Sequence, residues 1–138
     1  MYCFDTDVLS ATMRRDPPLA LVRRLALLAP ERQHTTAITV GELLFGAARA
    51  SRADLVERVR ALVTTAMAVL PFDADAATAY APVRAHLEAE GRPLAEPDLR
   101  IAAIAIAHDL TLVTGNTRHF ERVPGLRVED WLAGHAAA

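Results

Sequence analysis

The 138-residue sequence contains no lysine, and all 15 of its basic residues are arginines. Chemistry that needs a lysine is therefore excluded, whereas arginine is suited to forked contacts with phosphate or carboxylate. Cys3 is the one cysteine, so the chain cannot form a disulfide within itself, which fits a reducing cytoplasm. We find no signal peptide and no apolar run near the roughly 18 residues of a membrane span. We therefore expect a cytoplasmic protein that does not enter the membrane.

Aromatic residues are also scarce, at 5% of the chain, although apolar residues make up 52%. This apolar content excludes extensive disorder, and the length suits one domain with its own core. The abundance of alanine predicts helices that pack closely. The net charge of -2 gives no sign of nucleic-acid binding by itself.

Short apolar runs alternate with helical patterns along the chain, which predicts an α/β fold whose central parallel sheet has helices on both faces. Pro82 predicts a kink or break inside one helix. We expect strands at residues 2–5, 33–38, 67–72, 110–114 and 126–128, and helices at residues 7–15, 17–29, 40–49, 52–66, 75–90 and 96–108.

Three acids follow or precede the predicted strands at comparable places. Asp5 ends the first strand, Glu42 lies in the first turn of the helix after the second, and Asp98 lies in the first turn of the helix before the fourth. Strand C-termini and helix N-termini share one edge of such a sheet, so these three carboxylates can meet there. A cluster of carboxylate oxygens is typical of a Mg²⁺ or Mn²⁺ site.

Each acid also has a structural interpretation. Asp5 or its neighbours can cap a helix, and Thr39 with Glu42 matches a capping box. Asp98 suits the positive end of a helix dipole. However, Asp98 shares a helical face with Ile101, and an inward-facing charge needs a partner. That position favours a site over a solvated cap.

Four sequence blocks together carry a family resemblance. They are FDTDVLS, ITVGELLFGA, GRPLAEPDLRIAAIA and LTLVTGNTRHFERVPGLRVEDW, in this order. Nearly end to end, the chain resembles the PIN-domain ribonucleases, specifically the VapC toxins of bacterial toxin–antitoxin modules. The resemblance implies one three-layer α/β/α PIN-like domain over residues 1–138. It also implies an endoribonuclease that uses Mg²⁺ or Mn²⁺ and acts as the toxin of a type II module.

By the same resemblance, Asp5, Glu42 and Asp98 are the catalytic metal ligands, and metal-activated water hydrolyses the RNA phosphodiester. Supporting positions are taken by Thr6, Thr114, Asn116 and His119. The chain departs from the family pattern at two positions. Asp7 stands where asparagine is usual, and His119 stands where many relatives carry a fourth acid. The second departure leaves the number of bound metals open.

The resemblance further implies a VapB-type antitoxin as partner, and a homodimer. An apolar helical stretch, Leu43–Ala48, is a candidate for part of the antitoxin docking groove. Arginines near the rim are candidates for contacts to RNA phosphates, with an ordinary solvated charge as the alternative for each. These arginines are Arg14, Arg15, Arg100 and Arg118.

Three other functions compete with the nuclease. The Asp5-x-Asp7 pattern also occurs in haloacid-dehalogenase-type phosphatases, and carboxylates at strand ends occur in response-regulator receivers, but both need a lysine that this chain lacks. A PIN scaffold that binds RNA or protein without cleaving is the remaining alternative. The presence of the three acids argues against this alternative, whereas the histidine at position 119, in place of a fourth acid, argues for it. The sequence does not specify the RNA target or the cleavage sequence.

Overall fold

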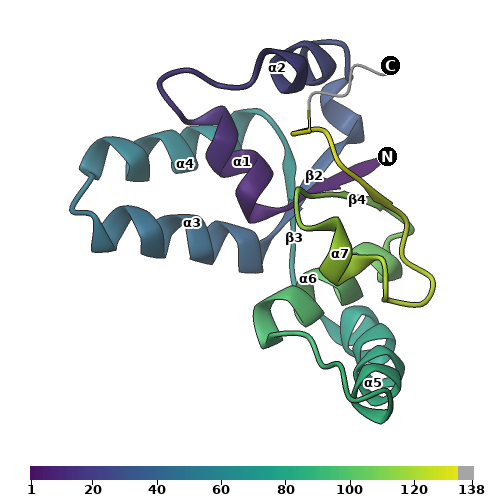
Figure 1. Ribbon diagram of the computed structural model, residues 1–138. Coiled ribbons are helices and arrows are strands. Elements are labelled where there is room, and N and C mark those ends of the chain that lie inside the picture. The colour runs from purple at the N-terminus through teal and green to yellow at the C-terminus, as the bar shows by residue number, and fades with distance from the viewer. Residues whose placement is uncertain (134–138) are drawn as a thin grey trace.

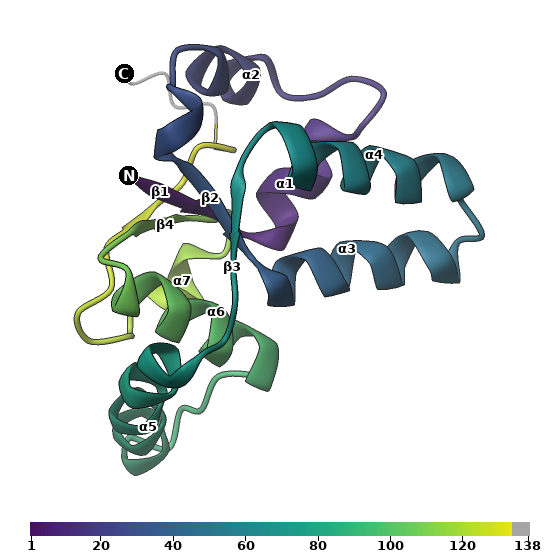
Figure 2. The same cartoon turned by 180° about the vertical axis from the view of Figure 1, so that it is seen from behind.

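A computed structural model describes residues 1–133, and its centre is a five-stranded parallel sheet with helices on both faces (Figures 1 and 2). The strand order is β3-β2-β1-β4-β5, and every neighbouring pair is parallel. The predicted three-layer α/β/α architecture is therefore confirmed. The strands are β1 (Tyr2–Phe4), β2 (Gln33–Thr36), β3 (Ala68–Leu70), β4 (Thr111–Val113) and β5 (Val128–Glu129).

All six predicted helices form, and two single-turn helices were not predicted because one turn gives no periodic pattern. The prediction of a single domain over residues 1–138 stays a prediction, since its last five residues lie outside the described part. The helices are α1 (Thr6–Thr12), α2 (Leu19–Ala26), η1 (Pro30–Arg32), α3 (Ala37–Arg49), α4 (Ala53–Thr65), α5 (Ala74–Ala89), α6 (Glu96–Ala107) and α7 (Thr117–Phe120).

Successive side chains of the central strands point to opposite faces of the sheet. This alternation produces two hydrophobic cores, one on each face. Cys3 and Leu112 pack in the core beneath α5 and α6, whereas Phe4 and Val113 pack in the core beneath α1 and α2. Figure 1 shows α1, α3 and α4 on one side of the strands and α5 and α6 on the other. The central strand β1 is apolar and β4 is apolar except for Thr111, as expected where both faces of a parallel sheet are buried, whereas β2 (Gln33–Thr36) is polar throughout.

The helix α5 continues through Pro82, so of the predicted kink or break, the break does not occur. Proline removes the hydrogen bond to the carbonyl four residues earlier, which belongs to Thr78. Both residues lie on the exposed face of α5, where water can satisfy that carbonyl. The buried face of the same helix, with Val83 and Leu87, packs in the core and holds the helix together.

The start of α3 corrects the sequence-based assignment of Glu42. The helix begins at Ala37, and its N-cap is Thr36, whose hydroxyl oxygen accepts a hydrogen bond of 3.0 Å from the Thr39 amide. The predicted capping box of Thr39 and Glu42 is therefore wrong, because β2 ends two residues earlier than expected. Glu42 lies in the second turn of α3, and its carboxylate is free of any capping role.

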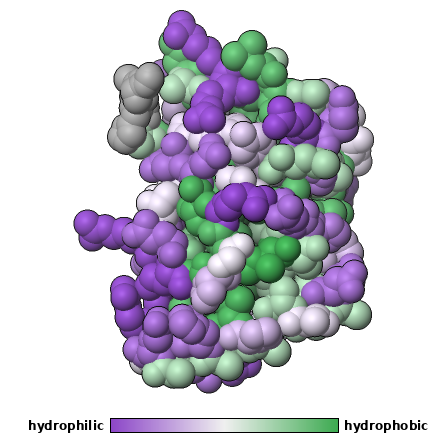
Figure 3. Space-filling model, turned by 90° about the vertical axis from the view of Figure 1, so that its right-hand side faces the viewer, coloured by the Kyte–Doolittle hydropathy of each residue, from purple (hydrophilic) through white to green (hydrophobic). Residues whose placement is uncertain are grey.

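Within residues 1–133, we find no helix with the length and apolar character needed to cross a bilayer. On the face shown in Figure 3, hydrophilic residues are interspersed with patches of apolar residues. Several large apolar side chains are exposed, and the most exposed among them are Leu27 at 88% and Phe45 at 64%.

Candidate active site

The site lies at the topological switch point of the sheet, where the strand order reverses. From β1 the chain adds β2 and β3 on one side, then returns to place β4 on the other side of β1. In open α/β sheets, a crevice forms beyond the carboxyl ends of the strands at such a switch point. Here Asp5 follows β1 directly and Thr114 follows β4 directly.

Asp5 joins these two strand ends. The Thr114 hydroxyl donates a hydrogen bond of 2.8 Å to Asp5 Oδ2, and the Thr6 amide donates one of 2.7 Å to Asp5 Oδ1. Asp5 is the N-cap of α1, so the cap interpretation is confirmed. The carboxylate nevertheless also lines the crevice, with a residual exposure of 6%. The cap fixes the carboxylate without removing it from the site.

Glu42 reaches the same crevice from α3. The Thr6 hydroxyl donates a hydrogen bond of 2.8 Å to Glu42 Oε1, although the two residues are 36 positions apart. Thr6 thus contacts two of the predicted acids, one through its backbone and the other through its side chain. This contact is what ties α1 to α3 at the polar edge.

Asp98 completes the set from the first turn of α6, where it is half-buried. The three predicted acids line one cleft of about 450 Å³, as expected from the shared edge of the sheet. We name it the acidic cleft. Its lining residues are Asp5, Thr6, Asp7, Ser10, Glu42, Asp98, Gly115 and Asn116.

Asp7 was not predicted as a site residue, although it stands where asparagine is usual in the family. Asp7 Oδ2 accepts a hydrogen bond of 2.9 Å from the Gly115 amide. A Cβ atom at Gly115 would lie 2.8 Å from that oxygen and 2.9 Å from a Leu132 methyl carbon, so the close approach requires glycine. The sequence feature that indicates a role for Asp7 is its place two positions after Asp5, in the first turn of the helix that Asp5 caps.

The crowding of carboxylates changes their proton affinities. Burial raises the pKa of Asp5 to about 6; hydrogen bonds from Thr114 and Thr6 oppose this rise, and the charges of Asp7 and Asp98 add to it. Burial, followed by the charge of Glu42, also raises the pKa of Asp98, while His119 lowers it. The cleft therefore favours a positive charge among its acids.

The remaining predicted positions lie just beyond β4. The Asn116 amide donates a hydrogen bond of 3.0 Å to the Thr114 hydroxyl, and the Asn116 side chain lines the acidic cleft. Asn116 Nδ2 and His119 Nδ1 are 3.3 Å apart. His119 lies outside the cleft and lines an adjoining groove that shares Asp98. Thr114 is fully buried and acts on the site through Asp5.

Comparison with known proteins now identifies the family. A family model described as "PIN domain" matches residues 2–126.

The chain belongs to the PIN-domain family.

Among curated PIN proteins, the "tRNA(fMet)-specific endonuclease VapC" of Shigella flexneri is 37% identical over 133 residues, covering 94% of this chain and 97% of the relative. The structure of VapBC2 from Rickettsia felis, bound to a DNA fragment from its promoter, matches with a TM-score of 0.85 and 27% identity, covering 94% and 98% of the two chains. That of FitAcB from Neisseria gonorrhoeae matches with a TM-score of 0.82 and 31% identity, covering 95% and 98%. The predicted VapC resemblance is confirmed.

The donor set of this PIN site suits a hard divalent cation, because carboxylate and amide oxygens line the cleft and its acids have raised pKa values. Within residues 1–133, however, no three Asp, Glu, His or Cys side chains are arranged to hold one ion directly. The residues therefore fit an ion that keeps part of its water shell, as Mg²⁺ usually does. Asp5, Glu42 and Asp98 are the side chains that would hold it.

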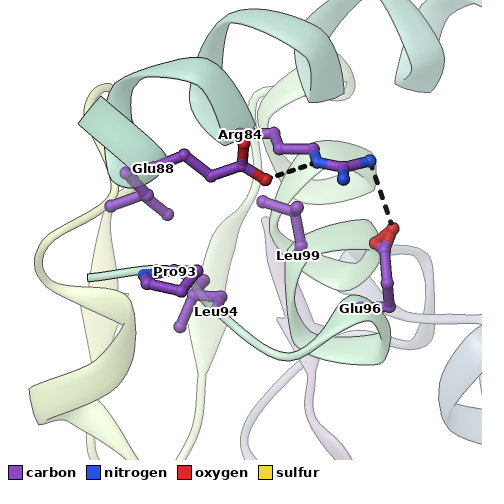
Figure 4. Close-up of a pocket in the computed structure, with 7 residues that line it drawn as sticks. Arg84, Glu88, Pro93, Leu94, Glu96 and Leu99 are labelled. Atoms are coloured by element: carbon purple, nitrogen blue, oxygen red, sulfur yellow. Dashed lines mark hydrogen bonds and ion pairs between the residues drawn. The ribbon is translucent and has the colours of Figure 1, made fainter. Parts of the chain in front are cut away.

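A second pocket lies between α5 and α6 and contains none of the predicted residues (Figure 4). Its volume is about 80 Å³, and Arg84 spans it toward two carboxylates. Arg84 Nε lies 2.8 Å from Glu88 Oε2, and Arg84 Nη1 lies 3.8 Å from Glu96 Oε1. Both carboxylates of this pocket are paired with the same arginine, so we assign the pocket a structural role.

A larger groove of about 860 Å³ runs from the acidic cleft between α1, α3 and α4. Leu43, Gly46 and Ala47 line it, so part of the predicted docking helix does face a groove. The candidate rim residues Arg14 and Arg15 also line it, whereas Arg100 lines none of the clefts described here. We name this the apolar groove.

Proposed function

We propose that this PIN protein is a metal-dependent endoribonuclease that acts in the cytoplasm as the toxin of a toxin–antitoxin module. The observation that carries the proposal is the meeting of Asp5, Glu42 and Asp98 in one cleft of a VapC-family chain. The names of its relatives support the substrate class, since one is called a tRNA(fMet)-specific endonuclease and others ribonucleases.

In this proposal, Asp5, Glu42 and Asp98 hold Mg²⁺ or Mn²⁺, partly through water. Such an ion supplies positive charge to the phosphate and makes water more acidic. Thr114 and the Thr6 amide fix the orientation of the Asp5 carboxylate. The Thr6 hydroxyl does the same for Glu42. The side chains are thus oriented before substrate arrives, which lowers the reorganisation needed during reaction.

The proposal is tested by incubating the purified protein with RNA over a range of Mg²⁺ and Mn²⁺ concentrations. We expect cleavage that excess chelator abolishes and that Asp98→Asn lacks. The matched variant Asp109→Asn removes an acid outside the cleft, at an exposed turn, and should cleave normally. Chelator-resistant cleavage that Asp98→Asn also lacks would contradict the metal requirement. Sequencing of RNA 5′ ends after induced expression would then identify the target.

The alternative is a PIN module that binds RNA without cleaving it. Two observations favour it, namely the absence of a direct three-residue ion site within residues 1–133 and the histidine at position 119. The same metal titration separates the two functions, because a binding module leaves the RNA intact at every metal concentration while still retarding it in a gel.

We also propose a VapB-type antitoxin as the partner that docks in the apolar groove. A structural relative is described as a member of the VapBC family of toxin–antitoxin systems. The groove joins an apolar lining to the acidic cleft through Glu42 and Thr6, so a bound segment can direct an arginine at the carboxylates. We expect Ala47→Arg to abolish inhibition by the neighbouring gene product while RNA cleavage continues. The predicted homodimer stays a prediction, which light scattering after gel filtration would test.

A further inference from the structure

A third groove adjoins the acidic cleft on the side opposite to α3. Its volume is about 560 Å³, and it shares Asp98 with the acidic cleft. Arg92 comes from the segment before α6, Arg118 and His119 come from α7, and Arg122 follows α7. Pro93, Leu94 and Ala95 supply the apolar part of the lining. We name it the basic groove.

The positive charges of the basic groove are not neutralised within the protein. Among residues 1–133, Arg92, Arg118 and Arg122 take part in no ion pair. Arg122 Nη1 donates a hydrogen bond to the Arg92 carbonyl, which orients that guanidinium but leaves its charge in place. Asp98 is the one acid in the lining, so three arginines outnumber it.

The apolar groove also carries arginines but has more apolar surface. Its Arg52 forms a forked pair with Asp54, with distances of 2.8 and 2.7 Å, whereas Arg58 donates to the Met13 carbonyl and keeps its charge. Arg14 and Arg15 also line it, and Met13, Leu43, Leu55 and Val59 contribute apolar surface. The two grooves that leave the acidic cleft therefore differ in the extent of their apolar lining, which is larger beside α3 and α4.

We propose that the basic groove binds the backbone phosphates of the RNA strand on one side of the scissile bond, with Arg92, Arg118 and Arg122 as the phosphate contacts. This inference rests on the proposed function and specifies where its substrate lies. The acidic cleft alone repels RNA, so adjacent positive charge is needed to keep the strand in place. Contacts of this kind position the strand and do not read its sequence.

The proposal has a consequence for the two partners. RNA leaves the acidic cleft over α7, whereas the apolar groove leaves it between α1, α3 and α4. RNA and antitoxin thus compete at the acidic cleft and have separate contacts beyond it. Loss of an arginine from the basic groove should weaken RNA binding without weakening antitoxin binding.

The test measures binding of a fluorescein-labelled single-stranded oligoribonucleotide by fluorescence anisotropy, in chelator and at several salt concentrations. Arg92→Gln and Arg118→Gln are the test variants, because both side chains are exposed and their loss should not disturb folding. Arg23→Gln is the matched control: it removes the same charge from exposed α2, which contributes to neither groove. Thermal melting verifies that all three variants are folded.

We expect each test variant to bind RNA about 5- to 10-fold more weakly than wild type, and the salt slope to fall by roughly 0.7 per lost phosphate contact. In cleavage assays, KM should rise while kcat changes little, since the lost contacts hold substrate and transition state alike. Arg23→Gln should match wild type. Capture of the neighbouring gene product should be unchanged in all variants.

Equal RNA affinity and salt slope in wild type and both test variants would overturn the inference, even if wild type cleaves RNA. An equal loss in Arg23→Gln would also overturn it, because the effect would then come from net charge alone. Loss of antitoxin capture in Arg118→Gln with unchanged RNA binding would make the groove a protein site. Failure of the proposed function looks different: wild type would cleave no RNA at any metal concentration, whatever it binds.

Discussion

The Thr6 hydroxyl donates a hydrogen bond of 2.8 Å to Glu42 Oε1, and this contact defines how α3 enters the acidic cleft. Glu42→Gln keeps an oxygen that can accept this bond but removes the negative charge that a divalent cation needs. We expect folding to survive and cleavage to fall by orders of magnitude, with weaker metal affinity by calorimetry.

Thr36→Ala is the matched control, because Thr36 caps α3 and does not line the cleft. It should lower the free energy of unfolding by about 1 kcal/mol and leave cleavage largely intact. If Glu42→Gln cleaves RNA normally, the role of Glu42 is structural and not catalytic.

Asp5 should make the stability of the metal-free protein depend on pH. Its pKa is about 6 in the folded protein and 3.8 in an unfolded chain, so the folded state holds the proton more tightly. The free energy of unfolding contributed by this group therefore falls as pH rises from about 4 to 6, by at most about 3 kcal/mol. Asp5→Asn should flatten this part of the profile, measured by urea denaturation in chelator. Identical profiles for the two proteins would contradict the prediction.

Removing a charge at Asp98 should separate stability from activity. Burial and the Glu42 charge disfavour the ionised form of Asp98, so Asp98→Asn relieves repulsion when no metal is present. We expect the metal-free melting temperature to stay equal or rise, while cleavage is lost. Saturating Mg²⁺ should raise the melting temperature of wild type much more than that of the variant. A clear drop in metal-free stability for Asp98→Asn would argue against a repulsive cluster.

Gly115 should tolerate no side chain while Asp7 keeps its position. The Cβ of Gly115→Ala would lie 2.8 Å from Asp7 Oδ2, so the loop or the carboxylate must move, at a cost of about 1–3 kcal/mol. Asp7→Ala removes that clash. A double-mutant cycle measured by urea denaturation should therefore show Gly115→Ala to be less costly in the Asp7→Ala background. Additive effects would show that Asp7 is not the source of the strain.

His119 should matter less than the three acids. It lines the basic groove and is 3.3 Å from Asn116, but it does not line the acidic cleft. We expect His119→Ala to keep substantial cleavage activity, and His119→Asp to bind Mn²⁺ more tightly by calorimetry. A loss in His119→Ala as large as that in Asp98→Ala would give His119 a direct catalytic role.

The sequence predicted the order of elements and the meeting of the three acids because both follow from periodic patterns and from the geometry of parallel sheets. The start of α3 was harder to predict. Thr36 and Thr39 both suit an N-cap by residue type, and only the position where β2 stops pairing decides between them. That position depends on strand pairing with β3, which is tertiary information.

The basic groove could not be predicted for a related reason. Arg92 and Arg118 are 26 positions apart, and their proximity depends on how α7 returns toward the start of α6. A single-turn helix such as α7 carries no periodic signal. The role of Gly115 was equally hidden, because its closest neighbour, Asp7, is 108 positions away. Contacts of this range follow from topology and not from local pattern.

The position of β1 at the centre of the sheet has a consequence for protein synthesis. β1 leaves the ribosome before the other four strands of the sheet, yet one of its two neighbours is β4, which ends at Val113. Until that strand and Thr114 have emerged, Asp5 lacks its hydroxyl partner and the β4 side of the crevice is missing. A nascent or truncated chain that stops before this point has all three acids but no assembled cleft. The acidic cleft is thus not assembled on the ribosome until residues 111–114 have emerged.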